Sequence, residues 1–243
     1  MFCQLCGKEK KLIDAHIIPR QLYKPLEQSE NIPPADEVLR VYSTTTYSKK
    51  RPIGTYDSKI LCGDCDNEIL GVLDNYAQTL LLKPFTETNY LSKDGKKLFY
   101  KLEDIDYPKF KLFFMSVLWR ASITNQDFFH QVNLGSWESV LKDMILNADP
   151  GTENDFSVIL SKYEGASATI MPNPQRIRTE GINYYKFRMG SYSVLIKVDQ
   201  RPFPGKLKPV VLRPNQPLLI QIKDYEDSKE FNTILENIDK FIK

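Results

Sequence analysis

Cys3-Gln4-Leu5-Cys6 and Leu61-Cys62-Gly63-Asp64-Cys65 are the two stretches that decide how the first part of this chain folds. Each contains a C-x-x-C pair, and together they use all 4 cysteines of the protein. Two residues between cysteines let both thiolates reach one tetrahedral ion, so two such pairs are typical of a four-thiolate zinc site. We therefore expect Cys3, Cys6, Cys62 and Cys65 to hold a structural zinc ion. Two redox pairs or four buried thiols are the alternatives.

Between the two pairs lies Ala15-His16-Ile17-Ile18-Pro19-Arg20, which contains one of the 2 histidines of the chain. The apolar neighbours of His16 predict a short strand that ends at Pro19. A histidine in such a run can simply be a hydrogen-bonded core residue. Its place between two cysteine pairs favours a position close to the expected zinc site.

The second cysteine pair opens a predicted helix over residues 62–82, which ends before Pro84. Apolar residues recur at helical spacing along it: Ile69, Leu70, Leu73, Tyr76, Ala77 and Leu80. Asp66 falls in its first turn, and Asp74 follows eight positions later. At about 3.6 residues per turn, these two carboxylates lie on nearly the same face. Asp66 could also serve only to complement the helix dipole, as any acid in a first turn does.

Composition sets the class of protein and its compartment. The 243 residues are 42% hydrophobic and 12% aromatic, which is typical of a folded globular chain. A net charge of +2 means that any nucleic-acid-binding surface must be local. The N-terminus lacks a secretory signal, and the most apolar run, residues 110–123, is too short and too charged to span a membrane. Together with metal-bound cysteines, which fit a reducing interior, these features predict a cytoplasmic protein without membrane association.

A lysine-rich link near residue 90 divides the chain into two expected domains, 1–88 and 89–243. The second contains a buried helix over 110–121 with Asp106 as its cap, and another helix capped by Ser136. Alternating apolar residues over 156–160 and 182–199 predict strands, with a hairpin turn at Met189-Gly190. A final amphipathic helix is expected over 228–242. The fold class is therefore α+β, with buried helices and an antiparallel sheet in the second domain.

The order C-x-x-C, A-H-I-I-P and L-C-x-x-C followed by a polar residue resembles the HNH nucleases. These are His-Me finger enzymes whose ββα site is built on a treble-clef zinc knuckle. The resemblance covers roughly residues 1–85. The chain is also similar to uncharacterised bacterial proteins that join an S/A-H-I-I-P motif to a downstream L-W-R-A segment, here Leu118-Trp119-Arg120-Ala121.

The resemblance implies a role for each matching position. His16 matches the general base, and imidazole suits that task because its pKa lies near neutral pH. Asp57 matches the asparagine that orients the base. Asp66 matches the histidine that ligates the catalytic cation, and a carboxylate there favours Mg²⁺ or Mn²⁺. Asp74 could supply a second oxygen. The basic residues expected to contact phosphates are Arg20, Lys49, Lys50 and Arg51, although the last three could equally form a solvated turn.

The sequence also departs from the family pattern. Many members place an acid or a histidine directly before the base, and here that position is Ala15. The first hypothesis is a metal-dependent endonuclease acting on nucleic acid, DNA rather than RNA. Its relatives resemble effectors of bacterial anti-phage defence and suggest a partner protein such as an ATPase. The second hypothesis is an inactive treble clef that only binds nucleic acid or a protein, and the third is a purely structural zinc domain.

Overall fold

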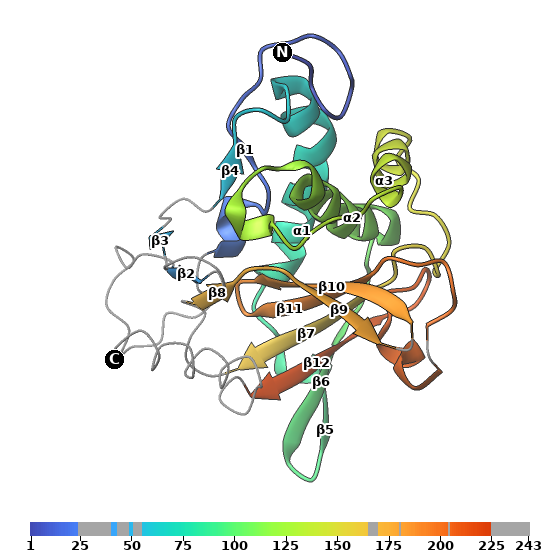
Figure 1. Cartoon of the computed structure of the whole chain (residues 1–243). Coiled ribbons are helices and arrows are strands. Elements are labelled where there is room, and N and C mark those ends of the chain that lie inside the picture. The colour runs from blue at the N-terminus through green and yellow to red at the C-terminus, as the bar shows by residue number, and fades with distance from the viewer. Residues whose placement is uncertain are drawn as a thin grey trace.

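The computed structural model describes residues 1–23, 40–42, 49–50, 55–164, 170–179, 181–203 and 205–224 (Figure 1). Arg51 and the helix expected over 228–242 lie outside these ranges. Within them the chain is a mixed α+β protein with three α-helices and a seven-stranded sheet, which confirms the expected α+β class. The sheet is mixed rather than antiparallel throughout, because one pair of its neighbouring strands is parallel. None of the helices in the described ranges has the length and hydropathy needed to cross a membrane.

The large sheet has the strand order β5-β6-β12-β7-β11-β10-β9. The strands are β5 (Tyr90–Lys93), β6 (Lys96–Leu102), β12 (Leu218–Asp224), β7 (Val158–Glu164), β11 (Tyr192–Lys197), β10 (Ile182–Met189) and β9 (Gln175–Thr179). All neighbours are antiparallel except β12 and β7, which are parallel. The prolines near the end of the chain predict that the last strands are edge strands or short pieces, but β12 lies inside the sheet. Pro217 precedes this strand and so removes no ladder hydrogen bond from it.

Two hairpins of this sheet form where the sequence predicts turns. β10 and β11 meet at Gly190, whose φ of 58° is the left-handed conformation that glycine adopts without strain. β5 and β6 meet at Asp94 and Gly95, with φ of 51° and 75°.

Helix α2 (Tyr107–Ile123) is the central element of the fold. Asp106 caps it by accepting a hydrogen bond from the Lys109 backbone N–H at 3.2 Å. Nearly every side chain from Phe110 to Ala121 is buried, as its continuous apolar run predicts. α3 (Trp137–Leu146) packs beside α2 and begins after Ser136, although the Ser136 side chain makes no capping bond.

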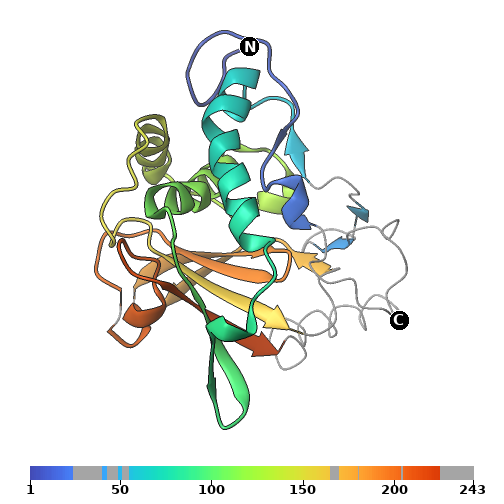
Figure 2. The same ribbon diagram turned by 180° about the vertical axis from the view of Figure 1, so that it is seen from behind.

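The N-terminal part is built from short elements that precede one longer helix. β1 (Ala15–His16) pairs antiparallel with β4 (Tyr56–Asp57), and 3₁₀ turn η1 (Arg20–Tyr23) follows β1. η2 (Cys65–Leu70) is a π-helical turn that continues into α1 (Gly71–Leu81). Figure 2 shows α1 running from the N-terminal end of the molecule toward the large sheet. The remaining elements are β2 (Arg40–Tyr42), β3 (Lys49–Lys50) and β8 (Ile170–Pro172), which form a small sheet, and the 3₁₀ turns η3 (Glu87–Asn89), η4 (Asp127–Phe129) and η5 (Gly205–Val210).

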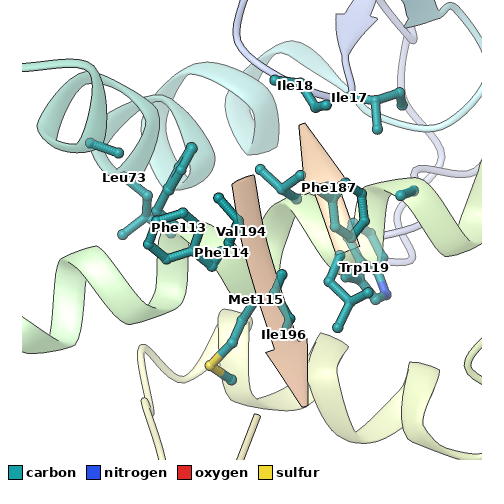
Figure 3. Close-up of a cluster of buried hydrophobic side chains, with 14 of the residues drawn as sticks. Ile17, Ile18, Leu73, Phe113, Phe114, Met115, Trp119, Phe187, Val194 and Ile196 are labelled. Atoms are coloured by element: carbon teal, nitrogen blue, oxygen red, sulfur yellow. The ribbon is translucent and has the colours of Figure 1, made fainter. Parts of the chain in front are cut away.

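One hydrophobic cluster joins the N-terminal part to the sheet through α2 (Figure 3). Ile17 and Ile18 come from the segment after β1, Phe113 and Trp119 from α2, and Phe187 from β10. All five are 1% exposed or less. The expected boundary between residues 88 and 89 remains a prediction about the chain, but the packing of the core is continuous across it.

Candidate functional site

The four cysteines come together at the N-terminal end of the molecule. Their Sγ atoms all lie within 4.8 Å of one another, and all four thiols are free of disulfides. Four sulfurs about 2.3 Å from one tetrahedral zinc ion would lie about 3.8 Å apart, which is compatible with this cluster. The residues present therefore fit a metal ion such as zinc.

The backbone around Cys3 explains why these sulfurs meet. Gly7 has φ of 68° and donates its N–H to the Cys3 carbonyl at 2.9 Å, so the chain turns tightly after the first pair. The Gln4 N–H bonds to the Ile60 carbonyl at 2.8 Å, which holds this turn against the second pair. The Cys62 N–H also points at the Cys3 sulfur, 3.4 Å away. Both pairs are therefore placed by main-chain bonds as well as by any ion.

The electrostatics of the cluster also favour a cation. Burial opposes ionisation of Cys3, but hydrogen bonds from the backbone N–H groups of Cys6, Cys62 and Leu5 outweigh it and lower its pKa to about 7. Burial raises the pKa of Cys65, and the neighbouring thiols raise it further. Four such thiols cannot all ionise without a positive charge among them, and a bound metal ion supplies that charge.

His16 lies at the end of β1, ten residues after Cys6, and is half-buried. In the β1–β4 ribbon it stands opposite Tyr56, and the two rings are 6.2 Å apart at 56°. Directly opposite residues of an antiparallel pair share one face of the ribbon. The imidazole and the Tyr56 ring therefore lie on the same face.

Asp57, which the resemblance matches to the residue that orients the base, has two partners of its own. It stands opposite Ala15 in the ribbon, and neighbouring side chains along a strand point to opposite faces. Its buried carboxylate accepts one hydrogen bond from the Lys59 backbone N–H at 2.9 Å and another from the Thr124 hydroxyl at 2.6 Å. Asp57 therefore ties β4 to the end of α2.

Asp66 lies in the π-helical turn, beside both His16 and Asp74. Burial raises the pKa of the Asp66 carboxyl; Asp74 adds to this rise, while Arg120 and His16 oppose it. Because a π turn holds one residue more than an α turn, two turns here take about eight residues, which brings Asp66 and Asp74 onto one face. In the described part of the chain, no donor hydrogen-bonds to the Asp66 carboxylate.

Asp74, by contrast, is engaged by an arginine from α2. Both of its carboxylate oxygens accept hydrogen bonds from Arg120, at 2.7 and 2.9 Å. The same guanidinium donates to the His16 carbonyl at 2.9 Å. Only 1% of the Arg120 side chain and 16% of the Asp74 side chain are exposed. Asp74 is therefore an ion-pair partner of Arg120, and each of its oxygens already accepts one charged hydrogen bond.

His16, Asp66 and Asp74 do not form a second closed ligand cluster. Among the residues that the structure describes, only the four cysteines bring three or more ligand atoms within 4.8 Å. An ion beside Asp66 would therefore have few protein ligands. Mg²⁺ tolerates this well, because it keeps several waters and is commonly held by one or two carboxylates together with substrate phosphates.

The expected phosphate contacts can be placed only in part. Arg20 is exposed at the start of η1, four residues after His16. Lys49 and Lys50 form β3, which pairs with β2, and their side chains lie outside the description.

Arg120 and Thr124 bond to the two strands of the site, but the sequence-based hypotheses assign them no role. Arg120 is one of two charged residues, with Lys111, in the mainly apolar run from Phe110 to Ala121, and it lies within the L-W-R-A segment. A charge in a run that predicts a buried helix is the signal by which a buried ion-pairing role could have been found. Thr124 carries no such signal, because a hydroxyl after a helix is common.

Comparison of the chain with protein families, with curated proteins and with solved structures finds no match.

Proposed function

We propose that this protein is a metal-dependent endonuclease of the HNH type, in which a treble-clef zinc knuckle carries a ββα site. The chain order supports this: β1 with His16, then β4, then the helix that begins with the second cysteine pair and carries Asp66. The first cysteine pair precedes β1, and the second follows β4 at the start of the helix. The zinc ion is then structural, and the chemistry belongs to the neighbouring residues.

The observation that carries the proposal is the placement of Asp66. Its half-buried carboxylate lies within electrostatic reach of His16, and its pKa is raised mainly by burial. The acids nearby have partners already: Asp57 bonds to Thr124, and Asp74 to Arg120. Asp66 is therefore the carboxylate of this group that is left to hold Mg²⁺ or Mn²⁺.

The proposed reaction is hydrolysis of a phosphodiester. The His16 imidazole takes a proton from water, the water oxygen attacks phosphorus, and the bond from phosphorus to the leaving sugar oxygen breaks. A divalent cation at Asp66, when bound, stabilises the charge on the phosphate and on the leaving oxygen. His16 suits the first step because it is half-buried rather than enclosed, so that water can reach it.

Nucleic acid is the substrate class, with DNA preferred over RNA. Arg20 is exposed just beyond His16, and Lys49, Lys50 and Arg51 supply further positive charge in the sequence. Because the net charge of the chain is only +2, we expect a partner protein, such as an ATPase, to deliver the substrate. A role in anti-phage defence belongs to the same proposal.

One observation favours the second hypothesis, a treble clef that binds without cutting. Ala15 is fully buried opposite Asp57, so β1 offers no additional metal ligand beside His16. The site then relies on Asp66 alone for a charged oxygen, unless Asp74 leaves Arg120.

Cleavage of supercoiled plasmid with Mg²⁺ or Mn²⁺ separates the two hypotheses. The wild-type chain is compared with His16→Ala and with His130→Ala, which removes the other, exposed histidine as a matched control. The endonuclease proposal expects nicking by wild type and His130→Ala, and its loss in His16→Ala at unchanged zinc content. Equal cutting by all three proteins, or none by the wild type, would favour the binding module.

A further inference from the structure

The end of helix α2 contacts both strands that carry the proposed site. Arg120 donates to the carbonyl of His16 on β1, and Thr124 donates to the carboxylate of Asp57 on β4. The two residues are four positions apart, one helical turn, at the point where α2 ends. The last turn of α2 and the residue that follows it therefore contact both strands of the β1–β4 ribbon.

Arg120 links three segments through a single guanidinium. It binds the carboxylate of Asp74 on α1 and the His16 carbonyl, and its Nη2 also lies 3.3 Å from the Ser116 hydroxyl on α2 itself. The planar fork of arginine has the fixed geometry that such a junction requires, whereas a lysine ammonium does not. Arg120 therefore joins β1 directly to α1, the helix that continues the turn carrying Asp66.

Stability alone is a weak reason for this arrangement. A buried ion pair is often no more stable than well-packed apolar residues of similar size, because both charges lose their hydration. Arg120 also pairs with Asp74, whereas the Asp66 carboxylate interacts with Arg120 and His16 only through their charges. The junction that Arg120 makes and its pairing with Asp74 both affect the geometry and the charge of the site. Neither adds to the buried apolar surface.

We propose that Arg120 and Thr124 are positioning residues that hold His16 and Asp66 in the arrangement that binds a divalent cation. This inference rests on the proposed function, because it assigns a support to the same site. Partners of metal-site residues typically change metal affinity by about 10–100-fold when they are removed. We expect a loss of about tenfold or more in cation affinity at Asp66, beside His16, when the Arg120–Asp74 pair is replaced.

The test follows the two histidine imidazole signals by NMR during a Mn²⁺ titration of the full chain. Mn²⁺ bound near His16 broadens that signal, and exposed His130 reports nonspecific broadening; His130→Gln assigns the two peaks. The key variant is Arg120→Met/Asp74→Leu, which removes one positive and one negative charge together. Zinc content and thermal melting establish that each variant is folded.

The wild-type His16 signal is expected to broaden selectively, and Asp66→Asn to abolish the effect. The Arg120/Asp74 variant should need about tenfold more Mn²⁺, and Arg120→Lys should fall between it and the wild type. An identical titration of the variant and the wild type would overturn the positioning role and leave the proposed cation site intact. Absence of selective broadening in the wild type would overturn the cation site and the positioning role together.

Thr124→Val tests the second contact, because valine keeps the shape and loses the hydroxyl. Ser122→Ala is its matched control: Ser122 is a hydroxyl at the same helix end that bonds to Trp119 and Glu138 instead of the ribbon. Thr124→Val should weaken Mn²⁺ binding at Asp66, as reported by the His16 signal, and Ser122→Ala should not. Equal effects of the two variants would refute a specific role for Thr124.

Discussion

The Arg120–Asp74 pair gives the most quantitative prediction for the fold. Replacing one partner leaves the other charge buried without compensation, which typically costs about 3–5 kcal/mol. Asp74→Leu strands a guanidinium that is 1% exposed, whereas Arg120→Met strands a carboxylate that is 16% exposed and can recover some hydration. We therefore expect Asp74→Leu to cost about 4 kcal/mol and Arg120→Met about 3 kcal/mol of unfolding free energy.

The double variant Arg120→Met/Asp74→Leu should be more stable than either single variant, since it leaves no buried charge. Its remaining cost reflects the unpaired His16 carbonyl, about 1 kcal/mol. Urea unfolding followed by tryptophan fluorescence measures all four proteins, because buried Trp119 lies next to Arg120. For a chain of this length, 3 kcal/mol corresponds to about 6–12 °C in Tm. Additive losses in the double variant, with no coupling, would refute the reasoning.

Three further predictions test other parts of the structure. Cys62→Ser should lose the zinc and unfold the N-terminal part, since the free energy of metal binding is folding free energy in such sites. Circular dichroism and metal analysis measure this. A variant that stays folded and zinc-loaded would show that the four thiols are not one site. Burial lowers the pKa of Lys111 to about 8, so the unfolded chain binds its proton more tightly and stability should rise with pH above 8. Between pH 8 and 10 this gain should reach about 2 kcal/mol relative to Lys111→Met in urea unfolding, and parallel pH profiles of the two proteins would contradict it. Asp106→Ala removes the cap of α2 and should cost about 1 kcal/mol by the same assay, and an unchanged midpoint would mean that the capping bond contributes nothing.

Local patterns predicted much of this molecule. The spacing of the two C-x-x-C pairs predicted that four thiols would meet, and Met189-Gly190 predicted a hairpin. Asp106 was identifiable as a cap because it directly precedes an apolar helical run. The hairpin and the helix cap each depend on residues only a few positions apart. The thiol cluster depends on the requirement that four sulfurs reach one metal ion.

The details of the site depend on longer-range geometry and could not be predicted in the same way. Asp57 shares a face with Ala15 and not with His16, because the register of two very short strands decides this and no pattern in them fixes the register. The π turn that contains Asp66 has no signature in the sequence. Arg120 reaches His16 and Asp74 only through the tertiary packing of α2.

Chemical rescue of His16→Gly tests the central claim most directly. The glycine leaves a space where the half-buried imidazole stood, and added imidazole can occupy it and accept the proton from water. We predict that His16→Gly does not nick plasmid DNA with Mn²⁺, and that millimolar imidazole restores part of the wild-type rate. A His16→Gly protein that cuts as fast as the wild type without imidazole would contradict the account.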